Sequence, residues 1–244
     1  MPDFFTALAT GTTLPTIAAE SLRDRGFVVV PGPYEGNRMP AVAAAYAAAE
    51  SSATGDDIRV GSTSTRVSDY VNRGAEFDEL YLFPPLLAAA CRVIGRPFKL
   101  SSLQSRTLRP GASDQGVHVD VRRHTADWPL LGFVLMIDEF RADNGATRFM
   151  PGSHLLPDGA EDNIPQARGQ PEGQVPASGP AGSLLIFNGS TWHGHGPNTS
   201  GAARRSLQGA FIPRAGRAGT DFAARMQPGT RARLGSLAHY LLAL

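Results

Sequence analysis

The first hundred residues combine segments that favour helix with one that favours a strand. Helices are predicted over residues 16–25, 41–50 and 77–94. Alanine dominates the second of these, and Pro84-Pro85 are expected to break the third into two pieces. The run Phe27-Val28-Val29-Val30 is apolar and largely β-branched, which predicts a strand. Residues 1–97 are therefore expected to form a mainly helical N-terminal layer, with a loop over residues 51–63.

From residue 98 the pattern changes to short apolar or alternating runs. These runs are FKLSSLQSRTL, GVHVDV, LLGFVLMIDEF, ATRFM, SLLIFN and RRSLQGAFI. Turn clusters such as Asp143-Asn144-Gly145 separate them, which favours a sandwich or barrel over alternating strands and helices. We expect a β core over residues 98–213, crossed by a long loop at 157–182, and a helical tail over residues 214–244. A chain of 244 residues suits one such domain.

Composition and charge exclude several classes of protein. The 23 basic and 22 acidic residues nearly balance, so a nucleic-acid partner is not expected. Cys91 is the only cysteine, which excludes a disulfide within the chain and a cysteine-rich zinc site. The chain has no run of about 18 apolar residues, and its start lacks the pattern of a secretory signal. We therefore expect a cytoplasmic protein with no membrane segment.

Two short motifs contain candidate metal ligands. His118 and Asp120 are two residues apart, so on a strand their side chains would share one face. His193 follows the run SLLIFN, which could lie beside that strand. Two histidines and one carboxylate leave three metal positions open, an arrangement typical of non-haem iron(II) oxygenases. His195 could share the orientation of His193 and stays open as a competing ligand, or as a residue facing the substrate.

A pair of arginines follows the second motif. Arg204 and Ser206 would share a face of the last strand, and a guanidinium beside a hydroxyl is a good receptor for the distal carboxylate of 2-oxoglutarate. Arg205 would point to the opposite face, toward solvent or a structural ion pair.

Other residues are candidates for the walls of the site. Gln104 and Arg106 share one face of the strand before the first motif, but the pattern leaves open whether that face points inward. We assign Gln104 to the cosubstrate, and Arg106, Trp128 and His195 to the substrate. Arg66, Arg122 and Arg123 could attract an anionic substrate, although solvated arginines are an equally good interpretation in an arginine-rich chain.

These motifs resemble the phytanoyl-CoA dioxygenase-like family of iron(II)- and 2-oxoglutarate-dependent oxygenases. The resemblance covers about residues 17–213, and its further matches are Gly26–Val30, Arg109–Gly111, Asn144–Thr147, Pro151–His154 and Trp192–Ser200. It implies a double-stranded β-helix, or jelly roll, with flanking helices. It also implies that His118, Asp120 and His193 hold iron(II), that Arg204 anchors 2-oxoglutarate, and that O2 is the second cosubstrate. Related halogenases carry a small residue at the position of Asp120, so the carboxylate here favours hydroxylation or another oxidative C–H reaction over halogenation.

The expected function is therefore a 2-oxoglutarate-dependent dioxygenase that hydroxylates an unactivated C–H bond of a small metabolite or natural product and releases succinate and CO2. Two alternatives stay open. One is a metal-binding jelly-roll protein without turnover, and the other is a divalent-metal hydrolase, although the sequence lacks a motif such as HExxH. Desaturation, cyclisation, epimerisation, acceptance of acyl-CoA and oligomeric state are not separated by these motifs.

Overall fold

The computed structural model of the chain describes residues 3–122, 130–157, 160 and 172–244. The strands are β1 (Phe27–Pro31), β2 (Ile58–Val60), β3 (Ser64–Val67), β4 (Phe98–Leu108), β5 (Leu131–Met136), β6 (Thr147–Phe149), β7 (Val175–Pro176), β8 (Ser183–Asn188), β9 (His193–His195) and β10 (Arg204–Pro213). The α-helices are α1 (Phe4–Gly11), α2 (Thr16–Arg25), α3 (Met39–Ser51), α4 (Asp78–Tyr81), α5 (Pro84–Ile94), α6 (Phe222–Arg225), α7 (Pro228–Arg233) and α8 (Ser236–Leu241). Short 3-10 helices are η1 (Gly55–Asp57), η2 (Tyr70–Asn72), η3 (Ala75–Phe77) and η4 (Ser153–Leu155).

The strands form two antiparallel sheets. The larger has seven strands in the order β1-β8-β5-β10-β4-β3-β2, and the smaller has three in the order β7-β6-β9. One apolar cluster contains Phe27 and Phe187 from the larger sheet together with Phe149 from the smaller sheet, so the two sheets pack face to face. This arrangement, with its flanking helices, confirms the predicted mainly β jelly-roll class.

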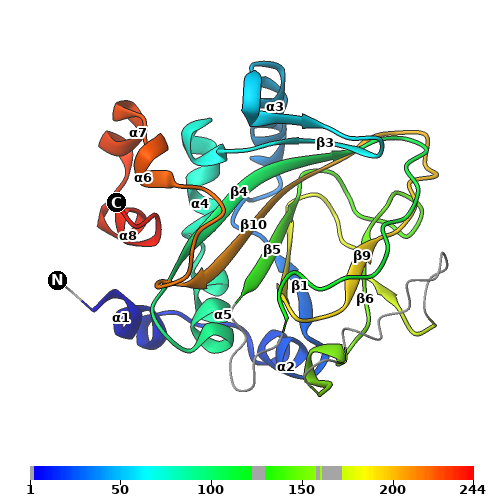
Figure 1. The fold of residues 1–244 in the computed structure, drawn as a ribbon, viewed down its shortest axis with the longest axis horizontal. Helices are drawn as coiled ribbons and strands as arrows, with labels where there is room; N and C mark the ends of the chain where they lie inside the picture. Colours follow the sequence, from blue (N-terminus) through cyan, green and yellow to red (C-terminus); the bar gives the residue numbers. More distant parts are fainter. Residues whose placement is uncertain (1–2, 123–129, 158–159, 161–171) are drawn as a thin grey trace.

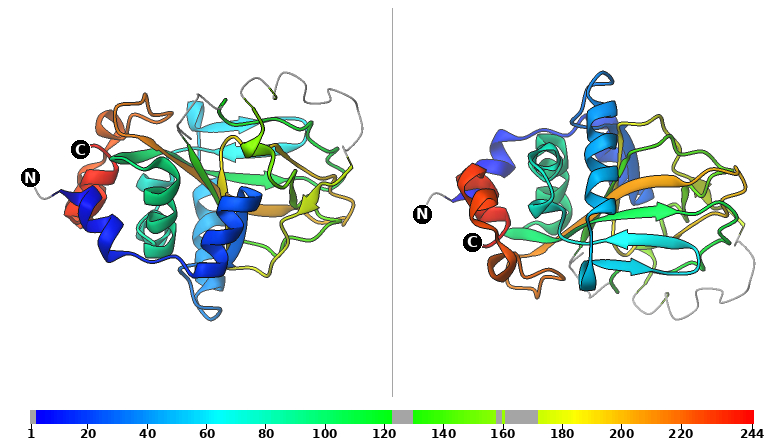
Figure 2. Two further views of the ribbon diagram at one scale, coloured as in Figure 1. Left: turned by 90° about the horizontal axis from the view of Figure 1, so that it is seen from below. Right: turned by 90° about the horizontal axis from the view of Figure 1, so that it is seen from above.

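Helices cover the other face of the seven-stranded sheet. The main apolar cluster joins residues of α3 and α5, such as Tyr46 and Leu86, to sheet residues such as Phe133 and Phe211. Figures 1 and 2 show α5 and the C-terminal helices on one side of this sheet and the smaller sheet on the other. The helical layer therefore stabilises the back of the sheet, and the front faces the space between the sheets.

The N-terminal region contributes more to the sheet than its helical pattern suggests. β1 forms one edge through pairing with β8, and the hairpin of β2 and β3 forms the other edge beside β4. The predicted loop at residues 51–63 contains β2, whose last two residues are exposed. An exposed edge strand lacks the alternation of apolar and polar residues by which a half-buried strand is found in a sequence.

Prolines and short apolar runs set the helix boundaries. Pro84 begins α5, so the predicted helix over residues 77–94 is divided as expected. The tail forms three short helices, α6 to α8, and Leu241 and Leu242 at its end are buried in the main cluster. Across the described part of the chain, the helices are too short or too polar to cross a lipid bilayer.

Candidate active site

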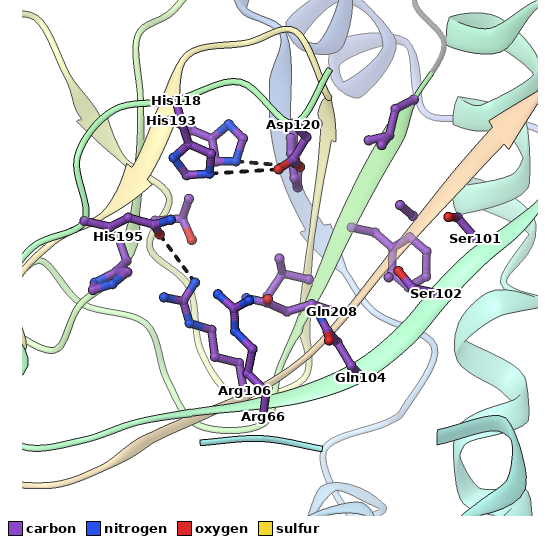
Figure 3. A pocket seen from close by; sticks show the side chains of 18 residues that line it. Arg66, Ser101, Ser102, Gln104, Arg106, His118, Asp120, His193, His195 and Gln208 are labelled. Atoms are coloured by element: carbon purple, nitrogen blue, oxygen red, sulfur yellow. Dashed lines mark hydrogen bonds and ion pairs between the residues drawn. The ribbon is translucent and has the colours of Figure 1, made fainter. Parts of the chain in front are cut away.

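The two motifs meet at one end of the space between the sheets. His118, Asp120 and His193 each offer one ligand atom, and these atoms lie within 4.8 Å of one another. The Nε2 atoms of His118 and His193 are 3.9 Å and 3.8 Å from the Asp120 carboxylate oxygens. Figure 3 shows the two imidazoles side by side, both directed at the carboxylate. The chain therefore brings together the three side chains that the sequence singled out.

Hydrogen bonds fix which imidazole nitrogen faces inward. The Nδ1 atom of His118 lies 3.1 Å from the Gly116 carbonyl oxygen, and that of His193 lies 2.8 Å from the Thr191 carbonyl oxygen. A carbonyl oxygen can only accept, so each Nδ1 carries a proton, and Nε2 is the nitrogen that can offer a lone pair to a metal when the ring is neutral. This is the tautomer that metal-binding histidines adopt when a carbonyl orients them.

The segment that carries His118 and Asp120 is not the strand that the alternation predicted. Only His118 forms a β-bridge, with His193. The Gln115 amide donates to the His195 carbonyl, whereas the His118 amide donates to the His193 carbonyl. Between these two hydrogen bonds the His118 segment advances by three residues and β9 by two. The extra residue interrupts the regular pairing, as in a β-bulge.

Close backbone approach at β9 requires a glycine. A Cβ atom on Gly194 would lie 2.8 Å from the Gln115 carbonyl oxygen and 3.0 Å from that of Gly116. Both distances are too short for a side chain. Gly194 therefore allows the His118 segment to lie against the strand that carries His193.

The environment of the three side chains suits a divalent metal. His193 is buried, and this burial lowers its pKa, although the Asp120 charge opposes the shift. A neutral imidazole keeps the lone pair that a metal requires. Two imidazoles and one carboxylate are a donor set that suits iron(II) and leaves coordination positions for other ligands.

A cavity of about 380 Å³ lies against this cluster. Gln104 and Arg106 both line it, so the face of β4 that the sequence left undecided points inward. His195 also lines the cavity, but its ring lies apart from the other two imidazoles, and its Nδ1 atom is 2.8 Å from the Gly196 carbonyl oxygen. Burial lowers the pKa of His195 to about 4.

Arg204 is deeply buried but lies behind the residues that line the cavity. Its Nη2 atom donates to the Gly145 carbonyl at 2.8 Å, its Nη1 atom contacts the Ser206 hydroxyl at 3.3 Å, and its guanidinium stacks 4.0 Å from the Phe140 ring centroid. The Nε atom has no hydrogen-bond partner among the described residues. Burial lowers the pKa of Arg204 to about 9. A buried cation without a carboxylate partner fits a place where an anionic ligand supplies the missing charge.

The described residues that line the cavity do not include three of the predicted ones, Arg205, Ser206 and Trp128. Arg205 forms a two-pronged ion pair with Asp138 at 2.7 Å and 3.0 Å, so of the two predicted alternatives, solvent or a structural ion pair, the ion pair is the one found. Ser206 donates at 3.3 Å to the Arg106 carbonyl. Trp128 lies outside the described residues, so its assignment to the substrate stays a prediction.

Several lining residues were not singled out by the motifs. They include Gln208 on β10, Gln115 before the first motif and Thr147 on β6. Gln208 is two residues beyond Ser206, so the alternation that grouped Arg204 with Ser206 would also have found it. Gln115 lies in irregular backbone, where no periodicity could have indicated it.

Comparison with known proteins adds a family match. Residues 22–206 match the family described as phytanoyl-CoA dioxygenase. The chain is 37% identical over 114 residues to the dioxygenase andF of Emericella variicolor and 36% identical over 110 residues to the dioxygenase cdmA of Talaromyces verruculosus. These alignments cover 43% and 41% of this chain, but only 38% and 35% of those proteins. The chain thus spans little more than a third of the length of these relatives.

Solved structures share the fold at low sequence identity. HygX from Streptomyces hygroscopicus, solved with nickel, 2-oxoglutarate and hygromycin B, has a TM-score of 0.67 and 15% identity, over 84% of this chain and 90% of that one. The 2-oxoglutarate-dependent carbocyclase SnoK from nogalamycin biosynthesis has a TM-score of 0.70 and 21% identity, over 89% and 93% of the two chains. The epimerase SnoN, from the same biosynthesis, has a TM-score of 0.65 and 20% identity, over 87% of this chain and 84% of that one. At such identities the likeness concerns the fold alone.

Proposed function

We propose, since this chain belongs to the phytanoyl-CoA dioxygenase family, that it is an iron(II)- and 2-oxoglutarate-dependent oxygenase. The substrate is a small molecule, and the proposed reaction is hydroxylation of an unactivated C–H bond with release of succinate and CO2. The observation that carries this proposal is the convergence of His118, Asp120 and His193 at the edge of a cavity.

The three converging side chains would hold the metal. Iron(II) with 2-oxoglutarate and O2 supplies an oxidant strong enough to cleave a C–H bond, and this chemistry belongs to the metal rather than to the protein. The chain's own residues bind the metal and the cosubstrate and orient them. The carbonyls of Gly116 and Thr191 hold the imidazoles in place, and Arg204 provides the positive charge for the distal carboxylate of 2-oxoglutarate.

Burial of these groups also serves the chemistry. His193, which lines the cavity, and Arg204, which does not, are 6% and 2% exposed, so water has little access to either side chain. Excluding water strengthens the attraction between the guanidinium and a carboxylate. It also protects a reactive oxidant from side reactions with solvent.

Hydroxylation is one of several outcomes that this scaffold supports. Two proteins of the same fold are described as an epimerase and a carbocyclase. The carboxylate of Asp120 completes the ligand set, which favours hydroxylation or another oxidative C–H reaction over halogenation, and among these reactions we propose hydroxylation. Analysis of the product, an alcohol that carries one atom of labelled O2, would separate it from the other reactions.

The cavity disfavours the metal-dependent hydrolase. Such an enzyme needs a general base beside the metal-bound water. Among the described residues that line the cavity, Asp120 is the only carboxylate, and it belongs to the ligand set itself. His195 also lines the cavity, but its ring lies apart from the other two imidazoles and burial lowers its pKa to about 4, which makes it a weak base. The described lining residues offer no second acid for this role.

Anaerobic titration tests the proposal. Iron(II) is added to the metal-free protein, followed by 2-oxoglutarate, and the weak visible charge-transfer band of the chelated keto acid is recorded. We expect the band in the wild type, its loss in His193→Ala, and a weakened 2-oxoglutarate affinity in Arg204→Ala. Arg59→Ala, at an exposed position on β2, is the matched control and should behave as the wild type. Iron binding without the band, or a preference for zinc, would contradict the proposal.

A further inference from the structure

We propose that Arg106 receives a carboxylate of the primary substrate, which makes that substrate a small carboxylic acid. Its other polar groups would contact Gln104 and Gln208. This inference rests on the proposed function, because it takes 2-oxoglutarate to be anchored by Arg204.

Arg106 is a buried cation without a matching anion. Its side chain points from β4 into the cavity (Figure 3), and the residue is 8% exposed. Among the described residues, the one hydrogen bond of its side chain is a long contact of 3.5 Å from Nη1 to the Gln115 side-chain oxygen, and the Nε atom has no partner. No carboxylate of the described residues forms an ion pair with it. A guanidinium held this way is costly in the empty protein, so the arrangement favours an anionic ligand.

A second arginine strengthens the positive charge of the cavity. Arg66, on β3, lines the cavity beside Arg106, and its charge adds to burial in lowering the pKa of Arg106. Asp120 is the only carboxylate among the described lining residues, and a bound metal would offset its charge. Two neighbouring guanidiniums repel each other unless an anion lies between them. The cavity therefore attracts anions.

The strand register separates Arg106 from the end where Arg204 lies. On the paired strands β10 and β4, Arg204 is opposite Leu108, Ser206 is opposite Arg106, and Gln208 is opposite Gln104. Successive inward-facing pairs are about 7 Å apart along a strand. Along the paired strands, Arg106 therefore lies one inward-facing pair beyond Arg204. Gln104 and Gln208 lie one further pair beyond Arg106.

This order fits three separate carboxylates. 2-Oxoglutarate has two, of which one belongs with the metal and the other with Arg204. Arg106 is left for a third, which the primary substrate must supply. A guanidinium binds a planar carboxylate through two parallel hydrogen bonds. The amides of Gln104 and Gln208 can both donate and accept, which suits hydroxyl or amide groups on the rest of the substrate.

Binding of a fluorinated probe pair tests the inference. 4-Fluorobenzoate and the uncharged 4-fluorobenzamide have the same shape, and 19F NMR reports their binding to the anaerobic protein loaded with iron(II) and saturating 2-oxoglutarate. We expect the benzoate to bind at least about tenfold more tightly than the benzamide, a difference of about 1.4 kcal/mol. This measurement uses the wild type alone, so it does not depend on the folding of any variant.

Arg106→Gln then identifies the receptor. We expect it to weaken benzoate binding at least about tenfold, to leave benzamide binding unchanged, and to change the 2-oxoglutarate affinity, read from the charge-transfer band, by less than about threefold. Arg59→Gln, which does not line the cavity, should change none of these values.

Three results would overturn the inference: equal binding of the two probes to the wild type, equal benzoate binding to wild type and Arg106→Gln, or a loss of 2-oxoglutarate affinity in Arg106→Gln comparable to that in Arg204→Ala. The last would assign Arg106 to the cosubstrate. Absence of the charge-transfer band from the wild type is a different failure, because it removes the proposed function before Arg106 is tested.

Discussion

At the scale of single residues, Gly194 connects backbone shape to the metal site. The carbonyls of Gln115 and Gly116 lie where its side chain would be. We expect Gly194→Ala to push the His118 segment away from β9, to lower the free energy of unfolding by about 1–3 kcal/mol, and to weaken iron(II) binding more strongly than Gly229→Ala. Gly229 lies in α7 with open space around it. Urea denaturation and iron titration measure both effects, and equal behaviour of the two variants would contradict this explanation.

A second residue-scale prediction concerns Arg106, whose burial works against stability. Burial lowers its pKa to about 10, which shows that the charged form is disfavoured there. Replacing a buried charge that has no partner with an apolar side chain of similar length removes this cost. We expect Arg106→Met to unfold at the same temperature as the ligand-free wild type or higher. Thermal denaturation checks this, and a clear loss of stability would show that Arg106 has a structural role instead.

At the scale of elements, a polar cluster joins α3 to the back of β4. The Glu50 carboxylate accepts hydrogen bonds from Ser105 at 3.1 Å and Thr107 at 2.7 Å, and the Tyr46 hydroxyl lies 2.8 Å from that of Thr107. Ser105 and Thr107 alternate with Gln104 and Arg106, so the cluster fixes from behind the strand that lines the cavity.

Removing the Glu50 carboxylate should weaken the contact between α3 and β4. Glu50→Ala leaves two partly buried hydroxyls without their acceptor, and we expect the free energy of unfolding to fall by about 1–3 kcal/mol. Glu20→Ala, at an exposed position on α2, is the matched control. Chemical denaturation compares the two, and an equally small effect in both variants would show that apolar packing alone holds α3 on the sheet.

The elements also show what local sequence signals can predict. α2 begins and ends where expected, because its boundaries depend on neighbouring residues such as Gly26, a left-handed C-cap. The His118 segment was predicted as a strand and is not one, because its pairing depends on contacts with residues more than seventy positions away. Alternation grouped Gln104 with Arg106, but the side they face is decided by which sheet surface the helices cover.

At the scale of the whole molecule, arginines of the C-terminal tail form ion pairs and hydrogen bonds with the N-terminal layer. Arg233 contacts Asp78 at 2.8 Å and donates to the Val71 carbonyl at 2.7 Å. Arg225 lies 3.0 Å from the buried Asp69. Phe4 of α1 also stacks on Tyr240 of α8, with ring centroids 4.8 Å apart, so α1 lies beside α8 (Figure 1), and the tail completes the main apolar cluster.

This connection is testable by one substitution. The Arg233 side chain is 26% exposed, so its ion pair is partly shielded from solvent. We expect Arg233→Ala to lower the free energy of unfolding by about 1–3 kcal/mol, because the Asp78 charge and the Val71 carbonyl lose their partner. Arg231→Ala, on the same helix but without an ion pair among the described residues, should be close to neutral. Matching values for the two variants would contradict a structural role for Arg233.

The candidate site was predictable in its residues more than in its arrangement. His118, Asp120 and His193 follow from two motifs, and the structure brings them together. The depth of Arg204 behind the lining residues was not visible in the sequence, because it depends on Gly145 and Phe140, which belong to a different loop. Long-range packing of this kind leaves no periodic signal.

The two sheets divide the site between them. The His118 segment and β9, which carry the proposed metal ligands, belong to the smaller sheet and its edge, whereas Arg106, Gln104 and Gln208 project from β4 and β10 of the larger one. We therefore expect that the proposed substrate-binding residues can be exchanged without disturbing the proposed metal ligands. For protein engineering, positions 104, 106 and 208 form a compact library through which the same metal chemistry could be directed to new acids, amides or alcohols.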